Sequence, residues 1–471
     1  MGTVRFFRHS TRLFRYYIPT EYIILAMIEF CLLIAALWLA IETRYYFHHT
    51  EINYAEYPLK GLLFATIMQL SLVAFGVYQR QSGRFADVLM LRIASGLLLG
   101  LIPLSLSFYF APMFFLGRGV MAISVVYSFL MISLLRLYFR RVVKERNMWS
   151  RVLILGSGNN AELIRKAKQE GELKGLNIVG FIHLEGDLNS SEDAIELDIP
   201  LVEYVRRHDV DEIVLAIDDR RKAGIPATDL LDCKMSGIDI LEMVSFFERR
   251  TGKIRLDVLH PSWLYLSDGF HESTFRSLSK RVFDILIVLC LMPLAFPLMI
   301  LTALAVLLES PRAGSVLYSQ VRVAQDGRPF NIYKFRSMVV DAEKDGVAQY
   351  AQKNDARITR VGRIIRKLRF DELPQLFNVL RGDMSFVGPR PERPQFVERL
   401  AETVPYYRER HRVKPGLTGW AQIRYPYGDT DLDAHEKLQY DLYYVKNFSI
   451  FLDLLILLQT AEVVMLGKGA R

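Results

Sequence analysis

The sequence predicts a membrane protein that combines membrane α structure with α/β structure: a four-helix transmembrane bundle, a Rossmann-like middle module and a mainly α third part with a re-entrant membrane helix hairpin. Three observations predict this fold class. Four apolar segments, each close to the length of a spanning helix, precede residue 140. A strand-helix alternation with a glycine turn follows residue 150. A long apolar segment containing two prolines precedes a basic C-terminal region.

Composition agrees with a membrane location. The 471 residues are 51% hydrophobic with a formal net charge of +8, and the apolar residues are concentrated in long runs. A basic chain without an RNA-reading motif fits anionic lipids and phosphates better than nucleic acid. We therefore expect membrane lipid as a partner and no nucleic acid. The cysteines and histidines show neither a disulfide framework nor zinc-ligand spacing.

The four spans predicted within residues 1–147 are residues 22–41, 59–77, 93–115 and 120–137. Basic residues gather before the first span, between the second and third, and after the fourth: Arg5, Arg8, Arg12, Arg15, Arg80, Arg84, Arg140, Arg141, Lys144 and Arg146. The other two connections carry only Arg44 and Arg118, so both ends of the bundle should be cytoplasmic. Glu29 and Arg92 are ionisable groups in or beside the spans, and we favour structural over functional roles for both.

The middle module is expected over residues 148–265. A buried-strand run, Val152–Leu155, leads into a turn with Gly156 and Gly158 and then a helical pattern, and further strand-like runs follow. This order resembles a dinucleotide-binding turn, in which glycines let backbone amides approach a diphosphate. No acidic residue stands clearly at the end of the second strand, where Glu185 or Asp187 would have to serve. A degenerate module for dimerisation or regulation is the alternative that we favour.

Residues 283–308 form an apolar run long enough to cross a bilayer. Positive charge on both flanks, from Lys280 and Arg281 before it and Arg312 and Arg322 after it, argues against crossing. Prolines 293 and 297 weaken helical hydrogen bonding near its midpoint. We therefore predict a re-entrant hairpin over residues 281–309, with a kinked fifth span as the alternative. Residues 448–466 are apolar but acidic at two positions, which favours an interfacial helix.

Residues 360–391 form the polar stretch that we expect to contain the functional site. Its first part places apolar residues on one helical stripe and arginines on the remaining faces. Asp371 and Glu372 follow, and Pro374 favours a new helix directly after them. Adjacent residues point in different directions, so the two carboxylates should have two different roles. Phosphoryl transfer needs such a nucleophile with surrounding positive charge; the alternative is an amphipathic surface helix with a solvated charge run.

Several motifs resemble one family in their order along the chain. They are Lys280-Arg281-x-x-Asp284, Tyr333-Lys334-Phe335-Arg336-Ser337-Met338, Asp355-x-Arg357-Ile358-Thr359, Asp371-Glu372-Leu373-Pro374-Gln375-Leu376, Gly382-Asp383-Met384-Ser385, Gly388-Pro389-Arg390-Pro391 and Val413-Lys414-Pro415-Gly416-Leu417-Thr418-Gly419-Trp420. Over residues 279–460 the chain resembles bacterial polyprenyl-phosphate sugar-1-phosphate transferases. The resemblance implies a catalytic domain over residues 266–471 that moves a phosphosugar from a UDP-sugar to undecaprenyl phosphate at the bacterial inner membrane.

The resemblance also implies the roles of individual residues. Asp371 would attack the β-phosphorus, releasing UMP, and Glu372, with Asp371 beside it, would hold Mg²⁺. Arg366 and Arg390 match positions that bind phosphate, and Pro297 matches the break of the re-entrant helix. Lys334, Arg336 and Lys414 are further candidates for substrate phosphates, with surface salt bridges as their alternative. Long members of the family have four spans and a Rossmann-like module, and we expect a homodimer.

Two departures from the family pattern affect loops. Ala324 replaces a glycine in the motif that starts at Gln320, which affects the conformation expected for that loop. Residues 423–428 differ from the usual sequence, and if that loop touches the sugar, the resemblance does not give the identity of the sugar. Two other function classes are alternatives. A membrane-bound nucleotide-sugar dehydratase or epimerase would need a Tyr-x-x-x-Lys pair after the glycine turn, and the sequence has none. A nonenzymatic nucleotide-sensing scaffold would leave the Asp371 to Pro391 motifs unexplained.

Overall fold

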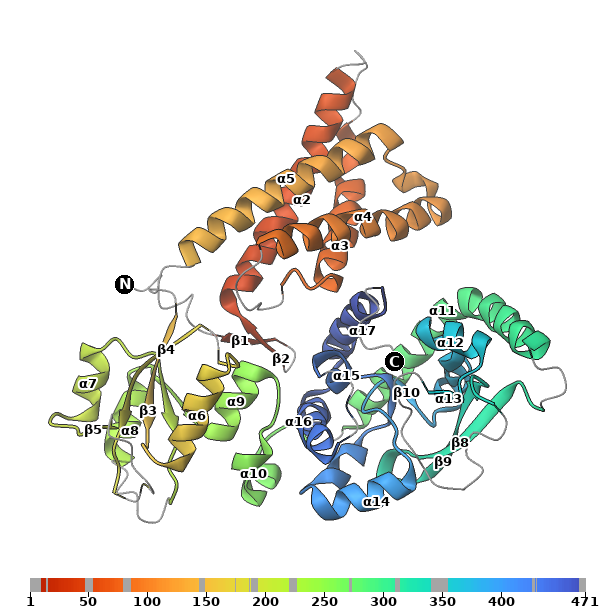
Figure 1. Ribbon diagram of the computed structural model, residues 1–471. Coiled ribbons are helices and arrows are strands. Elements are labelled where there is room, and N and C mark those ends of the chain that lie inside the picture. The colour runs from red at the N-terminus through yellow and green to blue at the C-terminus, as the bar shows by residue number, and fades with distance from the viewer. Residues whose placement is uncertain are drawn as a thin grey trace. The chain divides into compact units, whose positions relative to one another are not determined.

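The computed structural model describes residues 10–13, 16–46, 54–78, 86–143, 149–173, 175–185, 187, 194–219, 227–270, 273–309, 314–339, 355–425, 428 and 430–465. The chain forms two compact units, residues 1–258 and residues 259–471 (Figure 1). Several of the basic residues that predict the orientation lie outside the described residues: Arg5, Arg8, Arg15, Arg80, Arg84, Lys144, Arg146 and Arg312.

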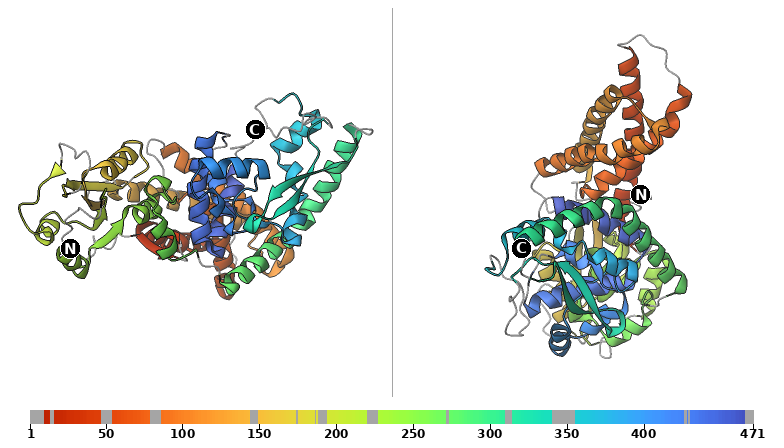
Figure 2. Two further views of the ribbon diagram at one scale, coloured as in Figure 1. Left: turned by 90° about the horizontal axis from the view of Figure 1, so that it is seen from below. Right: turned by 90° about the vertical axis from the view of Figure 1, so that its right-hand side faces the viewer.

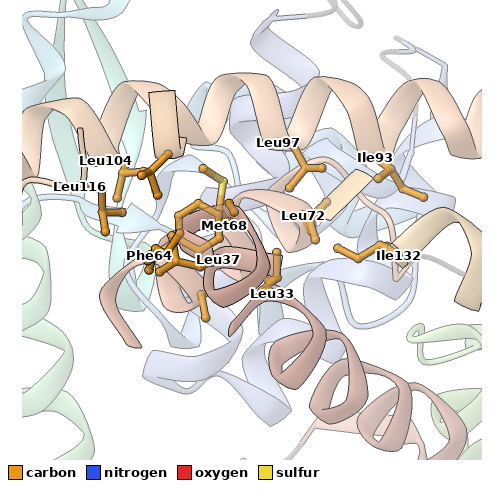
Figure 3. Packing of buried hydrophobic residues seen from close by; sticks show 14 of the residues in the cluster. Leu33, Leu37, Phe64, Met68, Leu72, Ile93, Leu97, Leu104, Leu116 and Ile132 are labelled. Atoms are coloured by element: carbon orange, nitrogen blue, oxygen red, sulfur yellow. The ribbon is translucent and has the colours of Figure 1, made fainter. Parts of the chain in front are cut away.

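The first unit contains the four predicted apolar helices. They are α2 (Thr20–Tyr46), α3 (Tyr57–Ala74), α4 (Ala86–Phe110) and α5 (Arg118–Val143). Leu33, Phe64, Met68, Leu72 and Ile132 meet in their common core (Figure 3). Other leucines of the same helices face outward and are exposed: Leu39, Leu62, Leu98 and Leu134. Helices that are apolar on all sides fit a lipid environment, as the sequence predicts.

A buried ion pair crosses this bundle. Arg136 on α5 donates from Nη2 to Oε2 of Glu29 on α2 over 3.0 Å, from Nε to Oε1 of the same carboxylate, and from Nη1 to the Val77 carbonyl over 3.1 Å. The Tyr78 hydroxyl also donates to Glu29. Arg92 bonds a backbone carbonyl just after α3. Both charges of the buried pair are satisfied inside the protein, which agrees with the structural role favoured for Glu29.

The middle module of the first unit is a parallel sheet in the order β5-β4-β3-β6-β7. Its strands are β3 (Ser150–Leu155), β4 (Leu176–Ile182), β5 (Ala194–Ile195), β6 (Glu212–Leu215) and β7 (Asp239–Glu242). Its helices are α6 (Asn159–Gln169), α7 (Leu201–Arg207), α8 (Ala227–Met235) and α9 (Met243–Thr251). This doubly wound order confirms the predicted Rossmann-like architecture. The hairpin of β1 (Ser10–Leu13) and β2 (Tyr16–Pro19) precedes α2.

The second unit is mainly helical. Its helices are α10 (Pro261–Leu266), α11 (Thr274–Glu309), α12 (Arg360–Lys367), α13 (Gln375–Arg381), α14 (Pro394–Thr403), α15 (Trp420–Arg424), α16 (Asp431–Asn447) and α17 (Ile450–Met465). The strands β8 (Leu317–Val323) and β9 (Pro329–Phe335) form an antiparallel hairpin (Figure 2), and β10 (Ser385–Val387) pairs in parallel with β11 (Gly416–Thr418).

The long apolar segment forms one helix, α11, which contains both Pro293 and Pro297. The chain stays helical through both prolines, so any change of direction at Pro297 is a bend within one helix. Together with α2 to α5, α11 is one of five helices in the described ranges that are long and apolar enough to cross a membrane.

Polar contacts fix both ends of α11 to other elements of the second unit. Near its start, Lys280 donates to the Val387 carbonyl over 3.0 Å and to Asp453 on α17 over 2.7 Å. Asp284, one turn later, accepts from the Phe386 amide over 2.9 Å. At the other end, Glu309 accepts from the first turn of α12 over 3.0 Å. Lys280 therefore binds protein groups, although the sequence suggested only a flanking charge.

Candidate active site

Asp371 and Glu372 lie between two helices, where the sequence predicts them. After α12 ends, Arg369 takes a left-handed backbone conformation with φ 58°, and the chain enters a 3-10 turn over Phe370–Glu372. Pro374 then precedes the first residue of α13. This reversal brings both carboxylates into the protein, where their residues are only 8% and 9% exposed.

Three cations from different segments surround Glu372. Its Oε1 accepts from Lys334 Nζ on β9 over 2.9 Å and from Arg390 Nη2 over 2.8 Å. The guanidinium of Arg369 lies 3.8 Å from its Oε2. Charge-assisted bonds of this kind are shorter and stronger than neutral ones, so Glu372 is held firmly in one position.

The carboxylate of Asp371 is arranged differently. Among the described residues, no side chain or backbone amide donates a hydrogen bond to it, although Glu372 next to it accepts two. Burial and the neighbouring charge of Glu372 raise the pKa of Asp371, and Lys334, Arg366 and Arg390 lower it, so that the pKa lies at about 6. An oxygen without bound donors and with raised basicity is suited to nucleophilic attack.

The pKa of Glu372 moves in the opposite direction. Burial alone would raise it, but the positive charges of Lys334, Arg390 and Arg369 hold the pKa well below its usual range. Glu372 is therefore an anion at neutral pH, while the pKa of Asp371, at about 6, lies much closer to neutral pH. Environments that separate two carboxylates in this way are typical of sites where the two have different roles, as the sequence predicts.

The side chain of Asn378 on α13 places Lys334. Its Oδ1 accepts from the Tyr333 amide over 3.2 Å, and its Nδ2 donates to the Asn331 carbonyl over 2.8 Å. These two bonds attach the edge of β9 to α13, the helix that starts directly after Glu372. Lys334 therefore comes from a strand far away in sequence but reaches Glu372 from a rigid support.

Three glycines place the loop that carries Arg390. A Cβ on Gly388 would lie 2.3 Å from the Lys414 carbonyl oxygen, one on Gly416 would lie 2.0 Å from the Gly388 nitrogen, and one on Gly419 would lie 2.1 Å from the Gly388 carbonyl oxygen. The segment at Gly388 therefore packs with its backbone directly against the backbone of residues 414–419. A side chain at any of the three glycine positions would prevent this contact.

The other predicted phosphate-binding residues are less closely grouped. Arg366 is near enough for its charge to act on Asp371. Arg336 is half-buried just beyond β9, and its backbone amide donates to the Val316 carbonyl over 2.9 Å. The Lys414 ammonium lies at the far end of α13, 3.6 Å from where a Cβ on Gly382 would be. The structure thus brings Lys334, Arg366 and Arg390 to the carboxylates but places Lys414 elsewhere.

The structure describes one of the two loops that depart from the family pattern fully and the other only in part. Ala324 has an extended backbone with φ −93°, which any residue can adopt, so the missing glycine causes no strain. The left-handed positions come later, at Asp326 and Gly327. In the other loop, Pro426 and Tyr427 lie outside the described residues.

In the middle module, Gly156 serves the packing of the sheet. Its φ is +118°, and a Cβ there would lie 2.3 Å from the Ala216 carbonyl oxygen just after β6. Glycine is therefore required at this turn whether or not a ligand binds. The glycine pattern alone does not distinguish a nucleotide site from a structural turn.

The amides of the same turn already bind carboxylates of the chain. Beyond Gly158, the first two amides of α6 each donate to Asp218 over 2.8 Å. The Ser157 amide donates to Asp187 over 2.8 Å. These are the groups that would bind a diphosphate in a nucleotide-binding turn. Asp187, one of the two acidic residues considered from sequence, thus bonds the turn itself.

The donor set at Asp371 and Glu372 suits Mg²⁺. Mg²⁺ favours one or two carboxylates completed by water and substrate phosphates, and Glu372 keeps its Oε2 free of hydrogen bonds among the described residues. Within the same residues there is no group of three or more His, Cys, Asp or Glu side chains that could hold a metal by themselves. A metal here would therefore depend on substrate oxygens.

Comparison with known proteins identifies two parts. Residues 275–467 match the family described as bacterial sugar transferase, and residues 73–227 match the CoA-binding domain family. The chain is 32% identical over 381 residues to the UDP-galactose-lipid carrier transferase of Erwinia amylovora, covering 75% of this chain and 76% of the relative. The chain belongs to the bacterial sugar transferase family.

Two further relatives have related names. Undecaprenyl-phosphate galactose phosphotransferase of Salmonella typhimurium is 30% identical over 75% of this chain and 76% of its own length. UDP-N-acetylgalactosamine-undecaprenyl-phosphate N-acetylgalactosaminephosphotransferase of Aeromonas hydrophila is 43% identical over 55% of this chain, and the match spans 60% of its length. This sugar transferase is therefore similar to relatives named for different sugars.

Nucleotide binding by the middle module can be tested directly. Because carboxylates occupy the amides of the turn, we expect coenzyme A and NAD⁺ to give no saturable heat in calorimetry with the purified protein. Asp218→Asn removes one negative charge from the start of α6 and is expected to make anion binding easier there. Saturable binding of either nucleotide by the unmodified chain, lost in Ser157→Pro, would contradict this expectation.

Sequence reasoning missed some contacts of the site. Arg369 appeared only as one charge of a basic run, and its role depends on a left-handed backbone that the pattern does not predict. Gln422 accepts from Arg390 Nη1 over 3.3 Å. The buried pair Arg410 and Asp441 lies behind the Arg390 loop. Both residues of this ion pair stand in segments with several other charges, so the sequence pattern gives no signal for their pairing.

Proposed function

We propose that this sugar transferase moves a sugar 1-phosphate from a UDP-sugar to undecaprenyl phosphate and releases UMP, starting a membrane glycan. The observation that carries the proposal is the buried pair of carboxylates with opposite pKa directions among three cations. The names of the relatives supply the two substrates.

In the proposed mechanism, an oxygen of Asp371 attacks the β-phosphorus of the UDP-sugar. The bond between the β-phosphorus and the bridging oxygen breaks, and that oxygen leaves with UMP. A phosphate oxygen of undecaprenyl phosphate then attacks the same phosphorus, which releases Asp371 and forms a lipid diphosphate sugar. Two steps mean that the two anionic substrates need not meet in the site at once.

Positive charge makes both attacks possible. Repulsion between two unit charges 4 Å apart is about 1 kcal/mol in water and about 4 kcal/mol in partly buried surroundings. Arg366 and Arg390 would bind phosphate oxygens, with Lys334 beside them. Mg²⁺ held by Glu372 and Asp371 would supply further charge compensation to the diphosphate. Arg336 and Lys414 stay candidates for the outer phosphates.

We further propose that the site lies at the cytoplasmic face of the bacterial inner membrane, with α11 as a re-entrant element bent at Pro297. Both ends of α11 contact other elements of the second unit, which supports this proposal. A straight spanning helix would instead place its two ends on opposite sides of the bilayer. Exposed Ile364 on the basic helix α12 and exposed Leu368 directly after it suit the same interface. The introduced thiols of Phe275→Cys and Leu308→Cys should then both react with a membrane-impermeant thiol reagent from the cytoplasmic side only.

The pKa of Asp371 predicts an acid limit of activity. Its carboxyl must be ionised to attack, and burial raises its pKa to about 6 in the free protein. We therefore expect kcat/KM to fall about tenfold per pH unit below about pH 6. UMP release at subsaturating UDP-sugar, followed from neutral to acid pH, measures this profile. A flat profile well below pH 6, with the protein still folded, would contradict it.

The direct test of the function uses the full chain in detergent with undecaprenyl phosphate, Mg²⁺ and a panel of UDP-sugars. Release of UMP that depends on the lipid phosphate for repeated turnover supports the proposal. Release of UDP would instead indicate a glycosyltransferase. A homodimer, which we also propose, is checked by light scattering on the same preparation.

A further inference from the structure

The guanidinium of Arg410 is buried behind the proposed site. Arg410 lies in a 3-10 turn over Tyr407–Arg412 and is 6% exposed. Its Nε and Nη2 donate to Oδ2 of Asp441 on α16 over 3.0 and 2.8 Å, and its Nη1 donates to the Tyr407 hydroxyl over 2.9 Å. Asp441 is 2% exposed. Arg410 therefore has one fixed position.

A further hydrogen bond of the Arg410 guanidinium connects this residue to the proposed site. Arg410 Nη2 also donates to the backbone carbonyl of Arg390 over 3.0 Å. The side chain of the same Arg390 binds Glu372 over 2.8 Å and Gln422 over 3.3 Å. A continuous series of contacts thus leads from Asp441 through Arg410 to the backbone and then the side chain of Arg390.

We infer that Arg410 and Asp441 are positioning residues that hold Arg390 against Glu372, so that the Arg390 guanidinium is in place before a diphosphate binds. This inference rests on the proposed function, because it concerns the same site. Neither residue touches Asp371 or Glu372 in the described structure. Their effect would pass through the carbonyl of Arg390.

The chemistry of the pair supports positioning over simple stability. Removing two charges from water is costly, and well-packed apolar residues often stabilise a core equally well. An apolar pair could not donate a hydrogen bond to the carbonyl of Arg390. In the charged pair, Asp441 fixes the direction of the Arg410 guanidinium, which donates to the backbone carbonyl of Arg390. Preorganised cations are what a site that stabilises developing negative charge requires.

A matched control lies two residues away. Arg412 pairs with Glu409 over 2.9 Å in the same 3-10 turn, but its side chain is 66% exposed. No described contact links this exposed pair to the Arg390 loop. The same substitution at Arg410 and Arg412 therefore separates an effect on the site from an effect on the turn.

The test compares Arg410→Lys with Arg412→Lys in the full chain, using UMP release from the best UDP-sugar of the panel. We expect Arg410→Lys to lower kcat/KM by roughly 10- to 100-fold, as for residues that orient a site ligand from behind. Arg412→Lys should stay within about twofold of the unmodified protein. Circular dichroism and melting curves report the folded fraction, and rates are expressed per folded protein.

The pH profile supplies a second readout that a structural role would not change. A displaced Arg390 lowers the pKa of both carboxylates less, so the acid limit should move to higher pH in Arg410→Lys. In an Arg390→Lys background, Arg410→Lys should have little further effect, because it acts through that residue. If Arg410→Lys does not fold, Asp441→Asn, which keeps the guanidinium, replaces it in every comparison.

The outcomes separate two ideas. An unmodified protein that releases no UMP counts against the proposed function. If it is active but folded Arg410→Lys matches Arg412→Lys, the positioning role is wrong. The positioning role is also wrong if Arg410→Lys lowers kcat/KM equally in the Arg390→Lys background and leaves the acid limit of activity unchanged. That result would assign Arg410 a structural role. Failure of both Arg410→Lys and Asp441→Asn to fold likewise assigns the pair to stability.

Discussion

Asp371→Asn should reduce UMP release by about 1,000-fold or more, because an amide has no anionic oxygen to attack phosphorus. The residue is buried and accepts no hydrogen bond within the described structure, so the isosteric change should leave the fold intact. A burst experiment with radiolabelled UDP-sugar provides a direct measurement. Label should remain on the unmodified protein in the absence of lipid phosphate and be missing from Asp371→Asn.

The matched control is Asp326→Asn. Asp326 is an exposed carboxylate in the same unit with a left-handed backbone that asparagine also accepts. Its activity should equal that of the unmodified chain. Full turnover by Asp371→Asn would reject the nucleophile role, and equal losses in both variants would indicate damage to the unit.

Glu372→Gln should lower kcat/KM by roughly 100-fold, with Mg²⁺ effects as the diagnostic. The change removes an anion that three cations surround, so those cations lose their partner. Without the charge of Glu372, the pKa of Asp371 should fall. The acid limit of activity should therefore move to lower pH, opposite to the shift expected for Arg410→Lys.

A thermal-shift experiment checks the metal role of Glu372. Mg²⁺ in the presence of UDP should raise the melting temperature of the unmodified protein but not of Glu372→Gln, which tests the metal role apart from turnover. Glu409→Gln, at an exposed carboxylate of the same unit, serves as the control. A Mg²⁺-dependent shift of normal size in Glu372→Gln would reject the metal role of this residue.

Much of the architecture follows from periodicity. The apolar runs predicted the bundle and α11, and the strand-helix alternation predicted the parallel sheet, because both patterns depend on local spacing. The end of α12 and the start of α13 around Asp371 were predicted from Pro374 and the apolar stripe of the basic helix. Local chemistry was sufficient where the signal lay within a few residues.

Contacts between distant segments could not be predicted in this way. Lys334 reaches Glu372 while Lys414 does not, because β9 is bonded to α13 and Lys414 is at the other end of that helix. Arg136 lies inside a predicted span, and its pairing with Glu29 depends on which helices pack together. These choices are made by tertiary packing, which a single sequence does not encode in any local pattern.

The contact among Gly388, Gly416 and Gly419 limits how relatives of this enzyme can diversify. Since a methyl group at any of the three would overlap backbone atoms, this part of the site has little freedom to change shape when a different hexose is selected. Evolution of a new donor preference would have to proceed through neighbouring segments, such as the one at Gln422, which accepts a hydrogen bond from Arg390, while the glycine contact stays unchanged.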